Sequence, residues 1–165
     1  MNILLMILPL GLFAVQTGFK PERFVASGKF QLDAPVSQAF PMFEPIGEKR
    51  WAEGWEPLPV YPSNIQASEG TVFSTKAKGG QSIWTITRYE KGKLVEYNVV
   101  TPSHDATLIA VVCKPLGDSK TEVSVTYRIT SLSEKGSQFG REHSAQFNAL
   151  MLHWQDQISG ALSKN

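Results

Sequence analysis

The sequence predicts an α+β domain in which a curved antiparallel sheet of about seven strands wraps around one long C-terminal helix. Strand-like runs separated by short turn signals fill residues 64–131, and short connections between successive strands favour an antiparallel arrangement. After residue 136 the apolar residues recur at helical spacing. The apolar face of such a helix must be buried, and the sheet is the element available to cover it.

The composition allows one domain and disfavours a nucleic-acid partner. The chain has 165 residues, of which 42% are hydrophobic and 19% charged, enough for a single core. Its 16 Lys and Arg against 15 Asp and Glu give a net charge of +1 without any basic run, so we expect no nucleic-acid partner. Cys113 is alone in the strand-like run "LIAVVCKPL", which predicts a buried, unreactive thiol.

Residues 1–19 are predicted to be an apolar leader and residues 20–165 the folded domain. The apolar run from Ile3 to Val15 is too short for a membrane span but suits the core of a signal peptide, although no Lys or Arg precedes it. We therefore expect export or a membrane tether, with membrane contact only through residues 1–16 if they are not cleaved. The alternative is a cytoplasmic protein with a mis-assigned start or with its first residues packed against the domain.

The first predicted strand runs from Phe24 to Leu32, and two short helices are expected to follow it. Asp33 is a candidate cap and Pro35 is tolerated in a first helical turn. Pro41 and Pro45 limit that helix to about two turns, and residues 46–51 can form one more turn.

Six further strands are predicted between Asn64 and Ser131, which makes seven with the first. The first of the runs in this region is expected to hold two short strands around a turn at Glu69-Gly70. The runs are "NIQASEGTVFSTKA", "QSIWTITRYE", "KLVEYNVVTP", "ATLIAVVCKPL" and "KTEVSVTYRITSLS". Alternation places Tyr97 on the inward face with its valine neighbours, and it places Trp84 and Arg88 on one common face.

One amphipathic helix is predicted over residues 137–162, with His143 in the middle of its apolar face. At 100° per residue, the other members of this face lie within about 60° of His143. They are Phe139, Phe147, Leu150, Trp154, Ile158 and Ala161. We expect this face, and His143 with it, to point toward the sheet.

Several short pieces of the chain carry a resemblance to a known family. In order they are "FQLDAPVSQAFPMF", "GEKRWAEGWEPLPVYP", "GTVFST", "IWTITRYE", "TEVSVTYRIT" and the last helix with Trp154. Over about residues 24–162 the chain resembles the START-like superfamily, the SRPBCC or helix-grip group that includes polyketide cyclase-like proteins and the birch-pollen allergen type. The second piece is similar to a Glu-x-x-Trp, Gly-Trp-x-Pro stretch of an uncharacterised bacterial subgroup. The resemblance implies a pocket for a lipid or other hydrophobe, and in some relatives cyclase, aromatase or hydrolase activity.

The segment "GEKRWAEGWEPLPVYP" concentrates aromatic residues where charge and prolines predict a surface loop. We expect it to lay Trp51, Trp55 and Tyr61 across the open end of the space between sheet and helix. There the rings either wall a ligand cavity or plug the core. The acidic residues of the segment and its flank, interspersed with Lys49 and Arg50, are expected to form a solvated, ion-paired surface. These acidic residues are Glu44, Glu48, Glu53 and Glu56.

His143 is the one residue that the sequence singles out for chemistry. It is either a hydrogen-bonded core or cavity histidine, or a general acid or base, or a polar anchor for a ligand. Candidate partners are Tyr97, Glu96, Arg88, Tyr127 and His104, although His104 is expected to be an exposed loop residue. We expect no metal and no cofactor, because the histidines and Cys113 lack metal-ligand spacing and the sequence has no phosphate-binding glycine motif or nucleophile elbow.

The favoured interpretation is a non-catalytic protein that binds a hydrophobic small molecule or lipid between sheet and helix. One alternative is a cyclase- or aromatase-like enzyme that uses His143 in the same cavity. Another is a protein-interaction module that exposes Trp51 and Trp55. The predicted ligand-binding residues are Trp51, Trp55, Trp84, Tyr97, Phe139, His143, Phe147 and Trp154.

Overall fold

The computed structural model describes residues 18–77 and 80–164. Most of the predicted leader, residues 1–17, therefore lies outside the described residues. Within the described part, no helix is long and apolar enough to cross a membrane.

The described residues form one antiparallel sheet of seven strands in the order β1-β7-β6-β5-β4-β3-β2. Strands β2 to β7 follow one another as a meander, and β1 pairs with β7 along its whole length, from Arg23 opposite Thr130 to Leu32 opposite Thr121. This confirms the predicted α+β class and antiparallel sheet. The strands are β1 (Arg23–Leu32), β2 (Leu58–Tyr61), β3 (Val72–Ala77), β4 (Gly80–Glu90), β5 (Leu94–Thr101), β6 (Asp105–Pro115) and β7 (Thr121–Ser131).

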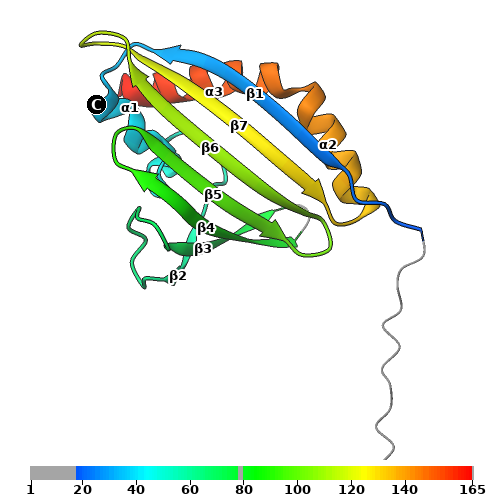
Figure 1. Cartoon of the computed structure of the whole chain (residues 1–165). Coiled ribbons are helices and arrows are strands. Elements are labelled where there is room, and N and C mark those ends of the chain that lie inside the picture. The colour runs from blue at the N-terminus through cyan, green and yellow to red at the C-terminus, as the bar shows by residue number, and fades with distance from the viewer. Residues whose placement is uncertain (1–17, 78–79, 165) are drawn as a thin grey trace, which may run out of the picture.

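Two helices, α2 (Glu134–Ala145) and α3 (Phe147–Leu162), cover one face of the sheet. Figure 1 shows them running behind β1 and β7. The connection from β1 to β2 consists of the short helix α1 (Val36–Ala39), which runs into the 3-10 turn η1 (Phe40–Phe43), and the 3-10 turn η2 (Gly47–Arg50). The short helical turns lie near the C-terminal end of α3 (Figure 1). This is the predicted arrangement of a sheet around a C-terminal helix with short helices after the first strand.

The predicted single C-terminal helix is divided at Gln146, whose backbone leaves the helical region at φ −98° and ψ 4°. Two close contacts explain the division. A Cβ atom at Gly140 of α2 would lie 2.2 Å from the Phe24 ring, and one at Gly28 of β1 would lie 2.7 Å from Met151 of α3. A straight helix cannot follow a twisted strand at both contacts. The helix also begins earlier than predicted, because Ser133 caps it by accepting a hydrogen bond from the backbone N–H of Gly136.

One predicted strand lies elsewhere in the chain. The run around Glu69-Gly70 contains one strand, β3, rather than two, because Gly70 and Thr71 bond to Ile86 of β4 in a tight loop. The remaining strand is β2, inside the segment expected to be a loop. Its Pro59 is tolerated because β2 is an edge strand. The predicted cap is also wrong: Pro35 occupies the N-cap of α1, and Asp33 pairs instead with Lys120 at 3.2 Å.

The core lies between the sheet and the helices. The η1 turn contributes Phe40, Met42 and Phe43, each at most 1% exposed. Cys113 on β6 is buried, and that burial raises the pKa of its thiol to about 12. This agrees with the expected buried, unreactive thiol.

We predict that Gly140→Ala lowers the free energy of unfolding by about 1–3 kcal/mol, because the added methyl group must displace the Phe24 ring. The matched control is Gly160→Ala on α3, where an added Cβ meets nothing within 4 Å. This control is expected to be neutral or stabilising by up to about 1 kcal/mol. Urea unfolding followed by circular dichroism measures both, and equal effects would contradict the close contact.

Candidate functional site

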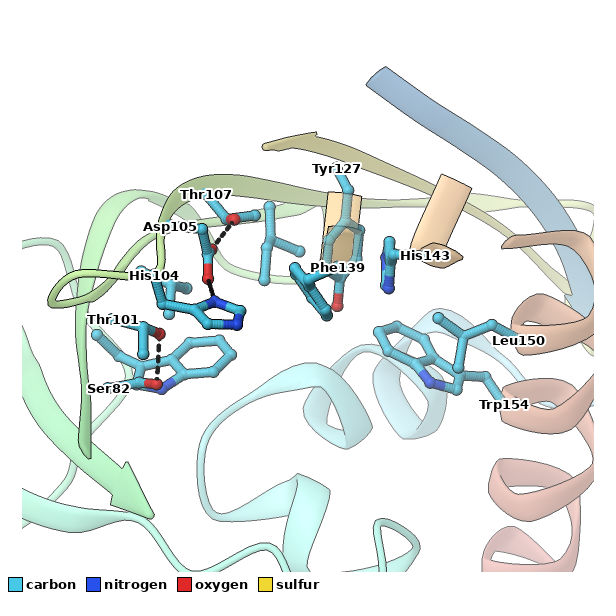
Figure 2. Close-up of a pocket in the computed structure, with 13 residues that line it drawn as sticks. Ser82, Thr101, His104, Asp105, Thr107, Tyr127, Phe139, His143, Leu150 and Trp154 are labelled. Carbon is cyan, nitrogen blue, oxygen red and sulfur yellow. Dashed lines mark hydrogen bonds and ion pairs between the residues drawn. The ribbon is translucent and has the colours of Figure 1, made fainter. Parts of the chain in front are cut away.

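A cavity of about 520 Å³, here called the main cavity, lies between the inward face of the sheet and the two C-terminal helices. Strands β4 to β7 supply one wall, and α2 and α3 supply the other. Figure 2 shows the lining side chains converging on this space. They are Ser82, Trp84, Val99, Thr101, His104, Asp105, Thr107, Ile109, Tyr127, Phe139, His143, Leu150 and Trp154.

The polar lining of the main cavity gathers near the turn between β5 and β6. Asp105 is buried, and its two carboxylate oxygens accept from His104 Nδ1 at 2.7 Å and from the Thr107 hydroxyl at 2.5 Å. The hydroxyls of Ser82 and Thr101 bond to each other at 2.8 Å. The carboxylate therefore orients the His104 ring, and Figure 2 shows the second ring nitrogen pointing away from Asp105 toward the interior.

The expectation that His104 is an exposed loop residue is wrong. Its side chain is 21% exposed and lines the main cavity. Two contacts bury it: Asp105 starts β6 facing inward and bonds to the His104 ring, and Phe139 of α2 packs on that ring at a centroid distance of 5.4 Å.

His143 reaches the main cavity from α2, as the helical periodicity predicts. Its ring lies 4.6 Å from that of Tyr127 and 5.4 Å from that of Phe139. Burial lowers the pKa of His143, and the negative charge of Asp105 opposes this shift. Its Nε2 atom is buried without a hydrogen-bond partner among the described residues. This setting favours the uncharged imidazole.

A smaller cavity of about 180 Å³, here called the side cavity, lies next to the main cavity. The two share Trp84, Ile109, Tyr127 and Trp154 in their walls. All four tryptophans of the sequence line this side cavity. Its lining is Glu48, Trp51, Ala52, Trp55, Trp84, Tyr97, Ile109, Val111, Tyr127 and Trp154.

Hydrogen bonds fix the aromatic walls of the side cavity. Trp51 Nε1 donates to the Met42 carbonyl and Trp55 Nε1 to the Pro45 carbonyl, each at 2.7 Å. The Tyr97 hydroxyl donates to the Phe43 carbonyl at 2.7 Å. Trp84 Nε1 donates to the Thr75 hydroxyl at 2.9 Å. These donors are therefore already engaged and are not free to meet a group inside the cavity.

The same rings also pack against one another. Trp51 meets Trp154 edge-on at 5.2 Å, and Trp55 meets Trp84 edge-on at 5.1 Å. Tyr61, expected beside them, is 70% exposed on β2 and lines neither cavity. Trp51 and Trp55 thus pack with the core and also line a cavity, so the two interpretations of the segment do not exclude each other.

Glu48 departs most from expectation. It is half-buried in η2 and lines the side cavity, and its carboxylate has no hydrogen-bond or ion-pair partner within the described chain. Burial raises the pKa of Glu48 well above its ordinary value. The pKa values of the Tyr97 and Tyr127 phenols are raised by burial and, to a smaller extent, by the Glu48 charge. The carboxyl group therefore faces these two phenols.

Close packing of η2 on η1 holds Glu48 in place. A Cβ atom at Gly47 would lie 1.7 Å from the Pro41 carbonyl oxygen, so only glycine allows this approach. Glu44 accepts a hydrogen bond from Tyr89 at 2.5 Å, and Arg50 donates to the Ala161 carbonyl at 3.4 Å. The expected solvated, ion-paired surface is consequently wrong for Glu44 and Glu48.

Two other predicted inward residues lie elsewhere. A register shift between Ile86 and Arg88 reverses the alternation of β4, so Arg88 is exposed and pairs with Glu90. Phe147 is buried in the core against Tyr127 and lines neither cavity.

The structure distributes the predicted ligand-binding residues over the two cavities. Trp51, Trp55 and Tyr97 line the side cavity, Phe139 and His143 line the main cavity, and Trp84 and Trp154 line both. Sequence reasoning named Tyr127 only as a candidate partner of His143, and it did not place Glu48, Asp105 or Thr107 in the site. Alternation along β6 could have found the last two, because Asp105, Thr107 and Ile109 share the inward face. Among residues 18–77 and 80–164, no cluster of His, Cys, Asp and Glu could hold a metal ion.

No protein-family model and no curated protein matches this chain. Solved structures do match. A protein of unknown function from Staphylococcus aureus has a TM-score of 0.65 at 13% identity, covering 88% of this chain and 96% of its own. CalU16 from Micromonospora echinospora has a TM-score of 0.58 at 17% identity, covering 88% and 90%. Norcoclaurine synthase from Thalictrum flavum, in complex with dopamine and hydroxybenzaldehyde, has a TM-score of 0.63 at 9% identity, covering 99% and 98%. The chain therefore has the helix-grip fold.

We predict that Glu48→Gln changes how stability depends on pH. In the unfolded chain the carboxyl ionises near its ordinary pKa of 4.5, whereas in the folded chain its pKa is raised. Wild-type stability therefore falls as the pH rises from about 4.5 through the folded pKa, and the variant lacks this loss. Between pH 4 and pH 8, the unfolding free energy of Glu48→Gln should therefore rise by about 1–3 kcal/mol relative to that of wild type.

Urea unfolding at pH 4, 6 and 8 measures this difference. The control is Glu56→Gln, since Glu56 is exposed in the same segment, and its effect is expected to stay within about 0.5 kcal/mol. His143 titrates equally in all three proteins and does not affect the comparison. A constant difference between wild type and Glu48→Gln over this pH range would show that the Glu48 carboxyl is solvated.

Proposed function

We propose that this protein binds a hydrophobic small molecule or lipid in the main cavity. The cavity itself is the observation that carries the proposal. Its volume of about 520 Å³ falls within the roughly 300–1,000 Å³ typical of small-molecule sites. Its walls are mainly aromatic and aliphatic, and its few polar groups gather near one turn, as is typical of such sites.

The fold supports this proposal by analogy with other proteins of the same fold. We propose that the chain is a START-like protein, since its helix-grip fold accompanies the motifs that resemble that superfamily. Norcoclaurine synthase, of the same fold, was solved with dopamine and hydroxybenzaldehyde bound. Both are small aromatic molecules, and an aromatic-walled cavity suits this class of ligand.

An interaction module built on exposed Trp51 and Trp55 has less support. Trp51 is 8% exposed and Trp55 is half-buried, and both indole N–H groups bond within the chain. A docking surface requires a contiguous exposed apolar patch, and these two rings do not provide one.

We expect Leu150→Trp to weaken binding of N-phenyl-1-naphthylamine, an uncharged fluorescent probe, at least tenfold. Leu150 of α3 lines the main cavity, so an indole there occupies the space of the ligand. The matched control is Leu152→Trp on the same helix, where the side chain is 62% exposed. The control should bind like wild type in a fluorescence titration. If Leu150→Trp also binds like wild type, or if wild type does not bind the probe saturably, the main cavity is not the binding site.

A second candidate function is proton-transfer catalysis in the same cavity. The observation that favours it is the hydrogen bond between Asp105 and His104, which leaves the second ring nitrogen facing the interior (Figure 2). A carboxylate that orients a histidine in this way is a recurrent general-base arrangement. His104 therefore replaces His143 as the preferred base, because His143 has no such carboxylate partner among the described residues.

We expect wild-type protein to accelerate exchange of deuterium into the CH₂ group of 2-naphthylacetone in D₂O, measured by NMR. In His104→Ala this acceleration should fall by at least about a hundredfold, the usual range for loss of a general base. His153→Ala is the control, since His153 is exposed on α3. Exchange by wild type at the buffer rate, or full activity of His104→Ala, would argue for binding without catalysis by His104.

A further inference from the structure

The side cavity indicates the chemical class of the ligand, an inference that rests on the proposed binding function. We propose that the ligand is an organic cation. Its ammonium group lies in the side cavity against Glu48 and the surrounding aromatic rings, and its apolar body fills the main cavity. Three features support this assignment: the charges of the lining, the direction of the donors, and the sizes of the two cavities.

The lining of the two cavities is acidic. Glu48 and Asp105 contribute carboxylates, and in the described chain no Lys or Arg lines either cavity. Asp105 is already satisfied by His104 and Thr107. His143 favours its uncharged form because burial lowers its pKa. An anionic ligand would find no lysine or arginine counter-charge here, whereas a cation would find the unpaired Glu48.

Most donors in the rings around Glu48 are engaged elsewhere in the chain. The indole N–H groups of Trp51, Trp55 and Trp84 bond to oxygens elsewhere, and the Tyr97 hydroxyl bonds to the Phe43 carbonyl. Tyr127 and Trp154 complete the aromatic wall, and neither of them donates a hydrogen bond to Glu48. Aromatic rings with a carboxylate among them attract an ammonium ion through cation–π and ionic interactions, which are strengthened where water is excluded.

The sizes of the cavities fit a ligand with two parts. The side cavity, at about 180 Å³, is smaller than the roughly 300 Å³ needed for a whole small-molecule ligand, but it has room for a head group. Trp84, Ile109, Tyr127 and Trp154 belong to both walls, so the cavities are adjacent. One molecule can therefore place a charged end beside Glu48 and an apolar end in the main cavity.

The assignment determines how affinity depends on pH. Burial raises the pKa of Glu48, so without ligand the carboxyl keeps its proton to a higher pH than an exposed glutamate does. A bound cation favours the carboxylate, so binding releases a proton and tightens as the pH rises through that pKa. The titratable groups that face Glu48 are Tyr97 of β5 and Tyr127 of β7, and α3 contributes the uncharged Trp154. Both phenols have raised pKa values and stay neutral up to pH 8.

The experiment compares two probes of one shape. Naphthylmethyl-trimethylammonium is the cation, and neopentylnaphthalene, in which carbon replaces the nitrogen, is the neutral analogue. Competition against N-phenyl-1-naphthylamine between pH 5.5 and 8 gives both affinities. We expect wild type at pH 8 to prefer the cation at least tenfold. In Glu48→Gln this preference should fall toward one, and in Glu56→Gln it should stay at the wild-type value.

The outcomes separate this inference from the proposed function. If the neutral analogue binds to wild type and the cation binds no more tightly, the cation assignment is wrong and hydrophobic binding stands. If neither probe nor N-phenyl-1-naphthylamine binds, the proposed function itself fails.

The pH profile of the wild type tests the assignment without any variant. Affinity for the cation that rises with pH supports it, as does proton release seen by calorimetry in buffers of different ionisation enthalpy. Affinity for the cation that stays constant or falls as the pH rises would overturn it, because binding would then not favour the ionised Glu48 carboxylate.

Discussion

The site depends on a set of hydrogen bonds that hold the connection between β1 and β2 in its folded form and attach it to β5. Aromatic side chains supply the donors, and the carbonyls of Met42, Phe43 and Pro45 are the acceptors. Met42 and Phe43 end the 3-10 turn η1 and Pro45 follows it, so helical bonding can satisfy few of these carbonyls. A buried carbonyl without a donor is costly. The aromatic side chains therefore satisfy the turn and, by the same contacts, become the walls of the side cavity.

This arrangement links local backbone geometry to the chemistry of the site. Gly47 lets η2 pack on η1, and that packing sets the direction of the next residue, Glu48. Because Trp51 and Trp55 direct their N–H groups to the backbone, neither of these two indoles donates to the Glu48 carboxyl. The bonds that stabilise the segment thus leave its acidic residue unpaired. The stability of the segment and the unpaired state of Glu48 thus have one structural cause.

The sequence predicted well those features that depend on periodicity. Alternation in the strands and the helical spacing of residues 137–162 gave the antiparallel sheet, its covering helix and the inward direction of His143. Alternation failed at Arg88, because a register shift turns β4 over after Ile86. A single extra residue in a strand leaves little trace in hydrophobicity, so this reversal is decided by pairing with β5 rather than by local sequence.

Features that depend on tertiary contact were not predictable from local patterns. Glu48 stands between charged neighbours in the sequence, and only the contact between Gly47 and Pro41 turns it inward. His104 precedes a strand in a polar turn, and its burial depends on Phe139 from a distant helix. The helix break at Gln146 likewise has no proline or glycine at that position. Its cause is the packing of both helices on the twisted strand β1.

The two acidic residues of the site differ in how far other residues of the chain satisfy their carboxyl groups. Asp105 is fully satisfied by its neighbours, so its role is complete within the chain and consists of orienting His104. Glu48 is half-buried without a partner among the described residues, and burial raises its pKa, so its ionised form costs folding free energy. An uncompensated polar group on a cavity wall gains its partner only when something binds. In the proposed binding function, the Glu48 end of the site is therefore the end at which a ligand supplies a partner that the described chain does not.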